Sequence, residues 1–151
     1  ESAVCFAAQL AARYAGHLSV FHMLPVPPHP KYTRENFKAD EARTRDRLTS
    51  EYQSYLEKID HQYLIRAGAL PHIEILECAN KENIDLIVMG SHTKQSLGKW
   101  YPGSVVERVG YRTTCPVVVI TDPAVLLHWD GPVPEDQHPE KDRLIHVFGS
   151  R

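Results

Sequence analysis

The segment "IDLIVMGSHTKQSLGKWYPGSVVERVGYRTTCPVVVI", residues 84–120, decides the fold class. It contains two nearly continuous runs of β-branched and aliphatic residues, 85–89 and 117–120. Runs of this kind are typical of parallel strands that are covered on both faces. Between them, residues 103–112 carry three valines on one helical face. The segment therefore predicts a strand, a helix and a second, parallel strand.

The preceding residues repeat this alternation of helix and strand. Apolar residues recur at helical spacing after Ser2, and Gly16 follows as a stop signal. A proline cluster that begins at Pro25 ends the next apolar run. Helices are expected over 2–15, 33–59 and 71–83, and strands over 18–24 and 62–66. The order predicts an α/β domain with an open, doubly wound parallel sheet.

The two later helices each show an apolar stripe that predicts the buried face. In the helix over 33–59 the charged residues are expected to form a solvated face, and the stripe consists of Leu48, Tyr52, Tyr55, Leu56 and Ile59. In the helix over 71–83 we expect Ile73, Leu76 and Ala79 to face inward, after Pro71 in the first turn.

The strand that usually opens such a domain is missing, because the chain begins with a predicted helix. Its last residues, "RLIHVFGSR" at 143–151, contain an apolar run, 144–148, followed by Gly-Ser. Joined to residue 1, they would read as a strand, a turn and a helix. We therefore hypothesise a circular permutation, or a piece of a tandem pair, and expect a five-stranded sheet whose first strand comes from residues 143–148.

Length and composition predict how the chain is organised. A chain of 151 residues with 42% hydrophobic residues suits one compact soluble domain. We expect an α/β domain over 1–122, a polar, proline-rich linker over 123–142, and the first strand and turn over 143–151, in the same or a neighbouring domain.

Charge and cysteine content exclude several classes of protein. The net charge of −2 argues against a nucleic-acid binder, and no apolar run reaches the roughly 20 residues that span a bilayer. Three scattered cysteines without a CxxC pair predict neither a disulfide framework nor a zinc site. We expect a cytoplasmic protein that binds a small molecule or a protein partner.

The loop after Gly90 is the candidate phosphate site. In an open α/β sheet, ligands bind beyond the carboxyl ends of the strands. Glycines let backbone N–H groups approach phosphate, and the helix after Gly103 and Ser104 adds partial positive charge. His92 and Lys94 lie in the same loop. The alternative is an ordinary loop in which Ser104 only caps the helix.

The strings "IDLIVMGSHT" and "PGSVVERVGYRTTCPVVVI" resemble the C-terminal half of the universal stress protein family. The shared features are the spacing of Gly90 from Gly103 and Ser104, and Cys-Pro-Val at the start of the last strand, residues 115–117. With the tail included, the resemblance extends over most of residues 1–121 and 143–151. It implies a Rossmann-like fold of the adenine nucleotide alpha hydrolase type.

The resemblance also implies ATP binding, because family members with the complete glycine pattern bind ATP. The backbone of Met23 would meet adenine, and the other implied site residues are Gly90, His92, Thr93, Lys94, Gly103, Ser104, Val105, Phe148 and Gly149. Two of these depart from the family pattern. Thr93 replaces a glycine, and Phe148 replaces an aspartate near the nucleotide and its Mg.

Three functions compete at this point. The first is a nucleotide-binding stress protein, in which ATP biases association with partners in stress-response signalling. The second is a dimeric assembly module without a ligand, which pairs through the edge strand 117–120 as the family often does. The third is an enzyme, but the segment from Gly90 to Gly103 lacks a GxxxxGK[ST] loop. We expect no catalysis beyond slow ATP hydrolysis, no resident protein-bound metal, no nucleic-acid or membrane partner, and a homodimer.

Overall fold

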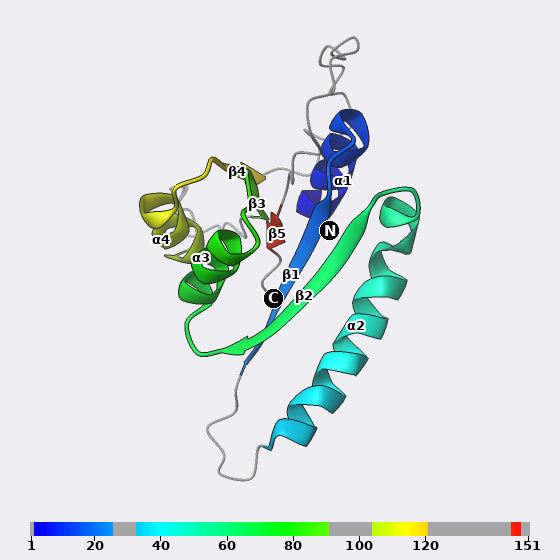
Figure 1. The fold of residues 1–151 in the computed structure, drawn as a ribbon, viewed down its shortest axis with the longest axis vertical. Helices are drawn as coiled ribbons and strands as arrows, with labels where there is room; N and C mark the ends of the chain where they lie inside the picture. Colours follow the sequence, from blue (N-terminus) through cyan, green and yellow to red (C-terminus); the bar gives the residue numbers. More distant parts are fainter. Residues whose placement is uncertain (1, 26–32, 91–103, 121–145, 149–151) are drawn as a thin grey trace, which may run out of the picture.

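The structure, a computed structural model, describes residues 2–25, 33–90, 104–120 and 146–148. Helices and strands alternate along the chain (Figure 1): α1 (Ser2–Tyr14), β1 (Leu18–Pro25), α2 (Arg34–Leu56), β2 (His61–Gly68), α3 (Pro71–Lys81), β3 (Ile87–Gly90), α4 (Ser104–Arg112), β4 (Val117–Ile120) and β5 (His146–Phe148). The strands form one sheet in the order β2-β1-β5-β3-β4, and every neighbouring pair is parallel. The predicted α/β fold with parallel strands is confirmed.

The last strand, β5, lies at the centre of the sheet. It pairs on one side with Ser19–Phe21 of β1 and on the other with Ile87–Met89 of β3. Residues 146–148 of the expected strand over 143–148 form β5. Residues 143–145 lie outside the described part. The division into domain and linker, and the permuted order, stay hypotheses.

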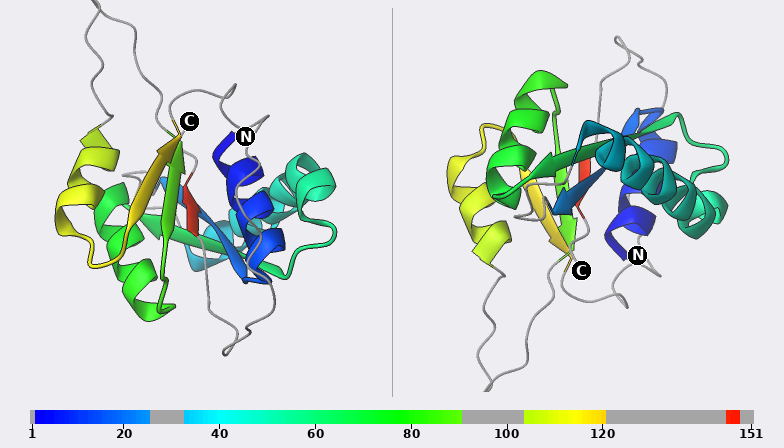
Figure 2. Two further views of the ribbon diagram at one scale, coloured as in Figure 1. Left: turned by 90° about the horizontal axis from the view of Figure 1, so that it is seen from above. Right: turned by 90° about the horizontal axis from the view of Figure 1, so that it is seen from below.

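Helices cover both faces of the sheet. Figure 2 shows α1 and α2 on one side of the strands, and α3 and α4 on the other. Strand residues alternate between the two faces. Val20 and Val88 therefore belong to the apolar cluster under α1 and α2, whereas Phe21 and Met89 belong to the cluster under α3 and α4.

The buried face of helix α1 is rich in alanine. Its buried residues are Ala3, Val4, Ala7, Ala8, Leu10 and Ala11. Helix α1 packs against β3 and β5 in particular, so the start of α1 is brought to the centre of the sheet.

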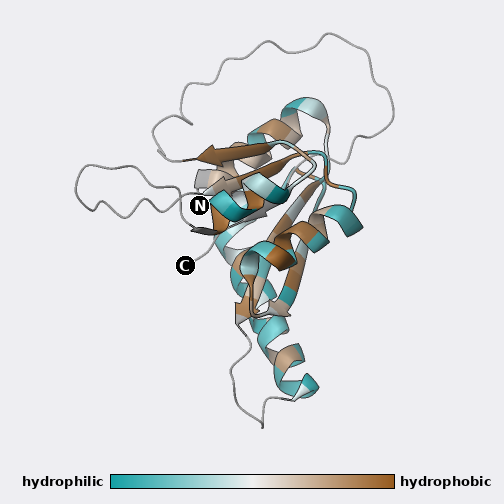
Figure 3. Cartoon of the chain, turned by 90° about the vertical axis from the view of Figure 1, so that its left-hand side faces the viewer, coloured by the Kyte–Doolittle hydropathy of each residue, from teal (hydrophilic) through white to brown (hydrophobic). Residues whose placement is uncertain are grey.

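Helix α2 begins with a capping box in which Thr33 accepts from the backbone N–H of Asn36 and the side chain of Asn36 accepts from the backbone of Thr33. Its buried stripe contains Leu48, Tyr52 and Leu56, as the periodicity predicts. The rest of the helix is mostly hydrophilic and exposed (Figure 3). The helix ends at Leu56, three residues before the predicted end at Ile59.

The predicted inner face of α3 is confirmed only in part. Ala79 is buried and the half-buried Leu76 packs against the core, whereas Ile73 is only half-buried. The centre of the buried face lies about one residue earlier than predicted, and its other members are His72, Ile75 and Cys78. Helix α3 is covered by α4 as well as by the sheet, and this second contact buries His72.

Candidate functional site

The site is expected where the strand order reverses. The chain leaves β1 through α2 towards one edge of the sheet, at β2, and leaves β3 through α4 towards the other edge, at β4. The reversal therefore falls between β1 and β3, at the position of β5. In open α/β sheets, ligands bind beyond the carboxyl ends of the strands at this point.

Gly90 ends β3 at this edge, and no described neighbour requires a glycine there. A Cβ atom added at Gly90 would meet the Cβ atom of Ala3 at 3.8 Å, an ordinary van der Waals distance. Its φ angle also lies outside the left-handed region that favours glycine. Neither the backbone conformation nor the packing of the described residues therefore requires a glycine at this position.

Two helices begin at this edge, one on each face of the sheet. Helix α1 starts at Ser2, next to Gly90 through Ala3, and has no acidic residue in its first turn. Helix α4 starts at Ser104 and carries an exposed Glu107 in its first turn. Helix N-termini bear partial positive charge, so both suit an anion. Val105 is half-buried and packs into the cluster under α3 and α4.

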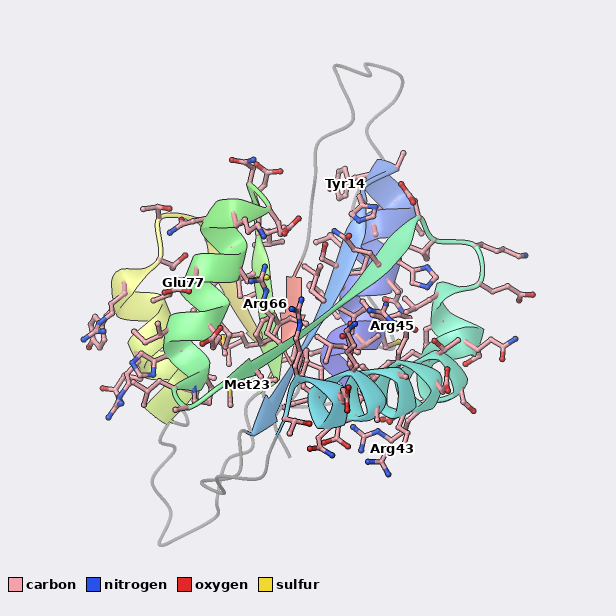
Figure 4. The ribbon with its side chains drawn as sticks, turned by 60° about the horizontal axis from the view of Figure 1, so that its bottom comes forward. Tyr14, Met23, Arg43, Arg45, Arg66 and Glu77 are labelled. Atoms are coloured by element: carbon pink, nitrogen blue, oxygen red, sulfur yellow. The ribbon has the colours of Figure 1, made fainter. Side chains whose placement is uncertain are left out.

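Met23 lies near the carboxyl end of β1, directly beside Arg66 of β2 in the sheet register. Figure 4 labels both residues in this region. An Nη2 atom of Arg66 lies 3.9 Å from Oε1 of Glu82 on the loop after α3, and the guanidinium also bonds the thiol of Cys78. Burial raises the pKa of Cys78 above its usual range, and Arg66 only partly offsets this. The thiol therefore stays protonated and unreactive.

Arg66 is not among the site residues predicted from the sequence, although the composition of its strand points to it. It is the single charged residue in the strand "HQYLIRAG", and an arginine in an otherwise uncharged strand requires a partner. Its place beside Met23 brings a cation to within one strand of the expected adenine contact.

His22 lies one residue before Met23, and its side chain meets α2. Its Nε2 atom lies 3.5 Å from an Nη2 atom of Arg47. Burial is the main cause that lowers the pKa of His22, and the charge of Arg47 lowers it further against the opposing effect of Glu51. The neutral imidazole can then accept a hydrogen bond from Arg47.

The structure gathers part of the predicted site. Gly90, Ser104 and Phe148 end or begin elements at the carboxyl edge, and Met23 lies at the same edge on β1. Phe148 aligns with Phe21 on one side and Met89 on the other. The remaining predicted residues, His92, Thr93, Lys94, Gly103 and Gly149, lie outside the described residues. Within the described ranges, no group of three His, Cys, Asp or Glu side chains could hold a metal ion.

Residues 1–121 match the universal stress protein family. The chain belongs to this family. The match ends before β5 and therefore gives no evidence of a circular permutation.

Two curated relatives come from Methanocaldococcus jannaschii. Universal stress protein MJ0531 is 32% identical over 118 residues, which cover 78% of this chain and 68% of that protein. Universal stress protein MJ0577 is 34% identical over 85 residues, which cover 50% of this chain. The chain thus spans about half the length of this second relative, because the match covers 52% of it.

A solved structure shows the same fold. The universal stress protein from Archaeoglobus fulgidus superposes with a TM-score of 0.61 at 22% identity, over 79% of this chain and 86% of the other. At this identity the likeness concerns the fold alone. None of the described helices is both long and apolar enough to cross a bilayer.

Proposed function

We propose that the chain binds an adenine nucleotide, ATP, at the carboxyl edge of the sheet and acts as a regulatory binding protein in a stress response rather than as an enzyme. The observation that carries this proposal is Gly90. It ends a buried strand next to the start of α1, in a conformation and a packing environment that would also accept a side chain. A ligand that approaches the backbone closely gives this position a reason to remain glycine.

The proposal gives the phosphates and the base of the nucleotide partners at this edge. The N-termini of α1 and α4 favour the negative phosphates. The backbone of Met23 would meet the base, with Arg66 beside it in the register. Phe148 occupies the strand end where the family has aspartate, so this chain offers no carboxylate there for Mg. We propose that Mg, where present, is held by the phosphates and water.

Calorimetric titration of the nucleotide-stripped protein with Mg-ATP tests the proposal, run beside Thr93→Gly, which restores the family glycine. Binding by the parent supports it. Binding by Thr93→Gly alone would show a site that this chain has lost. No binding by either variant would refute ATP binding and leave the assembly function described below.

The second candidate function is a homodimer through β4, and the two sheet edges differ in a way that favours it. At the β2 edge, the Nη1 atom of Arg45 donates to the carbonyl oxygen of Tyr63 at 3.3 Å. Among the described residues, no side chain caps β4 in this way. The apolar edge of Val117–Ile120 is half-exposed, and such edges are usually paired or covered.

The ladder between β3 and β4 identifies the groups that a partner strand would meet. Ile87 donates its backbone N–H to the carbonyl oxygen of Pro116 at 2.9 Å. Along a strand, backbone groups alternate between its two sides. Val118 and Ile120 therefore also bond towards β3, and the N–H and C=O groups of Val117 and Val119 point outward. Sedimentation velocity of the parent and of Val119→Pro, which removes one outward donor, tests the dimer.

The three cysteines form no disulfide in the structure, with Cys78 buried and Cys5 and Cys115 half-buried. Cysteines that stay reduced suit a reducing compartment, and we propose that the protein works in the cytoplasm. Immunoblotting of fractionated cells tests this proposal.

A further inference from the structure

The central strand of the sheet is the last strand of the chain. Strand β4 forms one edge of the sheet, and β5 lies two positions inward, beyond β3. A segment of 25 residues, 121–145, joins them. Fully extended, it would reach about 80 Å, so length alone allows β5 to fill the slot between β1 and β3 of its own chain or of a second copy. The geometry of the β4 edge distinguishes the two routes.

Within one chain, the connection has to return along the strand direction. Because β4 and β5 are parallel, the chain leaves Ile120 at the carboxyl edge and has to reach His146 at the level of Ile87 and Val117. It must travel back by about 13 Å and sideways by two strand spacings, about 10 Å. A connection between parallel strands crosses a face of the sheet, and helices cover both faces here.

Between two copies, the connection is direct. A two-fold axis that pairs β4 with its copy runs the two strands antiparallel. In this arrangement Val118 lies on the axis. The outward backbone groups of Val117 bond to the partner's Val119, and those of Val119 bond to the partner's Val117. Ile120 lies opposite the partner's Pro116. The end of β4 therefore meets the amino edge of the partner's sheet, where the slot for β5 begins. The path is three strand spacings, about 14 Å, and crosses no face.

We propose that two copies paired through β4 exchange β5, so that each sheet is completed by residues 146–148 of the other chain. This inference rests on the proposed homodimer and is independent of ATP binding. The exchanged strand leaves every pairing of the sheet unchanged, because β5 keeps its register with Ser19–Phe21 and Ile87–Met89. It has a consequence for the site: Phe148 at the carboxyl edge would come from the other copy, so neither copy has a complete site alone.

The test places two cysteines in neighbouring register positions of different chains. Ser19 and His146 are aligned across β1 and β5, at a Cα separation of about 5 Å that a disulfide can bridge. Full-length Ser19→Cys and His146→Cys chains are co-expressed with different tags, in a background with Cys5→Ser and Cys115→Ser. Oxidised dimers are separated without reductant, and the linked peptides are identified by mass spectrometry. The double variant Ser19→Cys/His146→Cys in one chain is the control for the register.

Exchange predicts a disulfide between residues 19 and 146 of different chains, in up to about half of the dimers, because random pairing of two equal species makes half of them mixed. Adding Val119→Pro to both chains abolishes this product by removing an outward donor of β4.

A dimer without the interchain disulfide, while the double variant forms an internal disulfide, overturns exchange and leaves the β4 dimer standing. Absence of both links overturns the placement of β5. A monomeric parent overturns exchange and the dimer together, and a link that survives Val119→Pro overturns the proposed route.

Discussion

Replacement of Gly90 by alanine tests whether this glycine is needed for the stability of the fold or for binding of the proposed ligand. The new methyl group would lie 3.8 Å from the Cβ atom of Ala3, which is a favourable contact distance. Because Gly90 has no left-handed φ angle, alanine fits its backbone, and the unfolded chain loses conformational freedom. We expect the free energy of unfolding to stay equal or to rise by about 0.4–1 kcal/mol.

The effect on ATP is expected to be the opposite. If the proposed ligand approaches the backbone at the carboxyl end of β3, a methyl group there would hold its phosphate oxygens away from the chain. We expect at least about tenfold weaker binding, equivalent to about 1.4 kcal/mol. Calorimetric titration gives the affinity, and urea denaturation gives the stability.

Gly110→Ala is the matched control. Gly110 lies within α4 and has no described atom within 4 Å of an added Cβ atom. Alanine there favours the helix by about 0.5–1 kcal/mol and leaves ATP binding unchanged. Unchanged ATP affinity in Gly90→Ala would refute the inference that a ligand approaches this glycine. A loss of stability in that variant would show that the glycine is needed for packing instead.

Three further predictions follow from single residues. Because Phe148 offers no carboxylate for Mg, ATP affinities with excess Mg and with EDTA agree within about threefold, and a gain above tenfold with Mg contradicts this. Burial lowers the pKa of His22 in the folded chain. The stability that this shift contributes above a pH of about 6.5 is therefore lost as the pH falls and the unfolded state takes up the proton. His22→Gln makes this loss shallower in denaturation curves between about pH 7 and 5.5, and an unchanged slope excludes His22. Arg45→Ala exposes the carbonyl oxygen of Tyr63 at the β2 edge, so we expect light scattering to detect larger assemblies. The free energy of unfolding should change by at most about 1 kcal/mol. An unchanged particle size would show that Arg45 does not protect this edge.

The strands were predictable because their periodicity is local. The β-branched run of Val117–Ile120 becomes β4 with the predicted bounds. Strand β3 begins at Ile87, two residues later than predicted, because its ladder starts where Ile87 donates to Pro116. Such a boundary depends on the neighbouring strand and is absent from the residues of β3 alone.

Burial of polar side chains was not predictable, because it depends on contacts between distant elements. His72 is only 6% exposed, although a polar imidazole side chain gives no reason from the sequence alone to place it inside. Burial lowers its pKa, and Arg108 and Arg112 of α4 lower it further. Only the packing of α3 on α4 brings these three residues together. Arg66 and Cys78 meet for the same reason, across β2 and α3.

The position of β5 links the completeness of the sheet to the geometry of the site. Met23 and Gly90 lie on β1 and β3, and in the described part of the chain these two strands pair with β5 and not with each other. Ile87 and Val88 are fully buried beside it, so the core also depends on this strand. A ligand that spans Met23 and Gly90 binds tightly only when β5 holds the two strands in register. Binding and the docking of β5 must therefore stabilise each other by the same free energy, whichever copy supplies the strand, and hydrogen exchange of the β5 amides should slow when ATP is added.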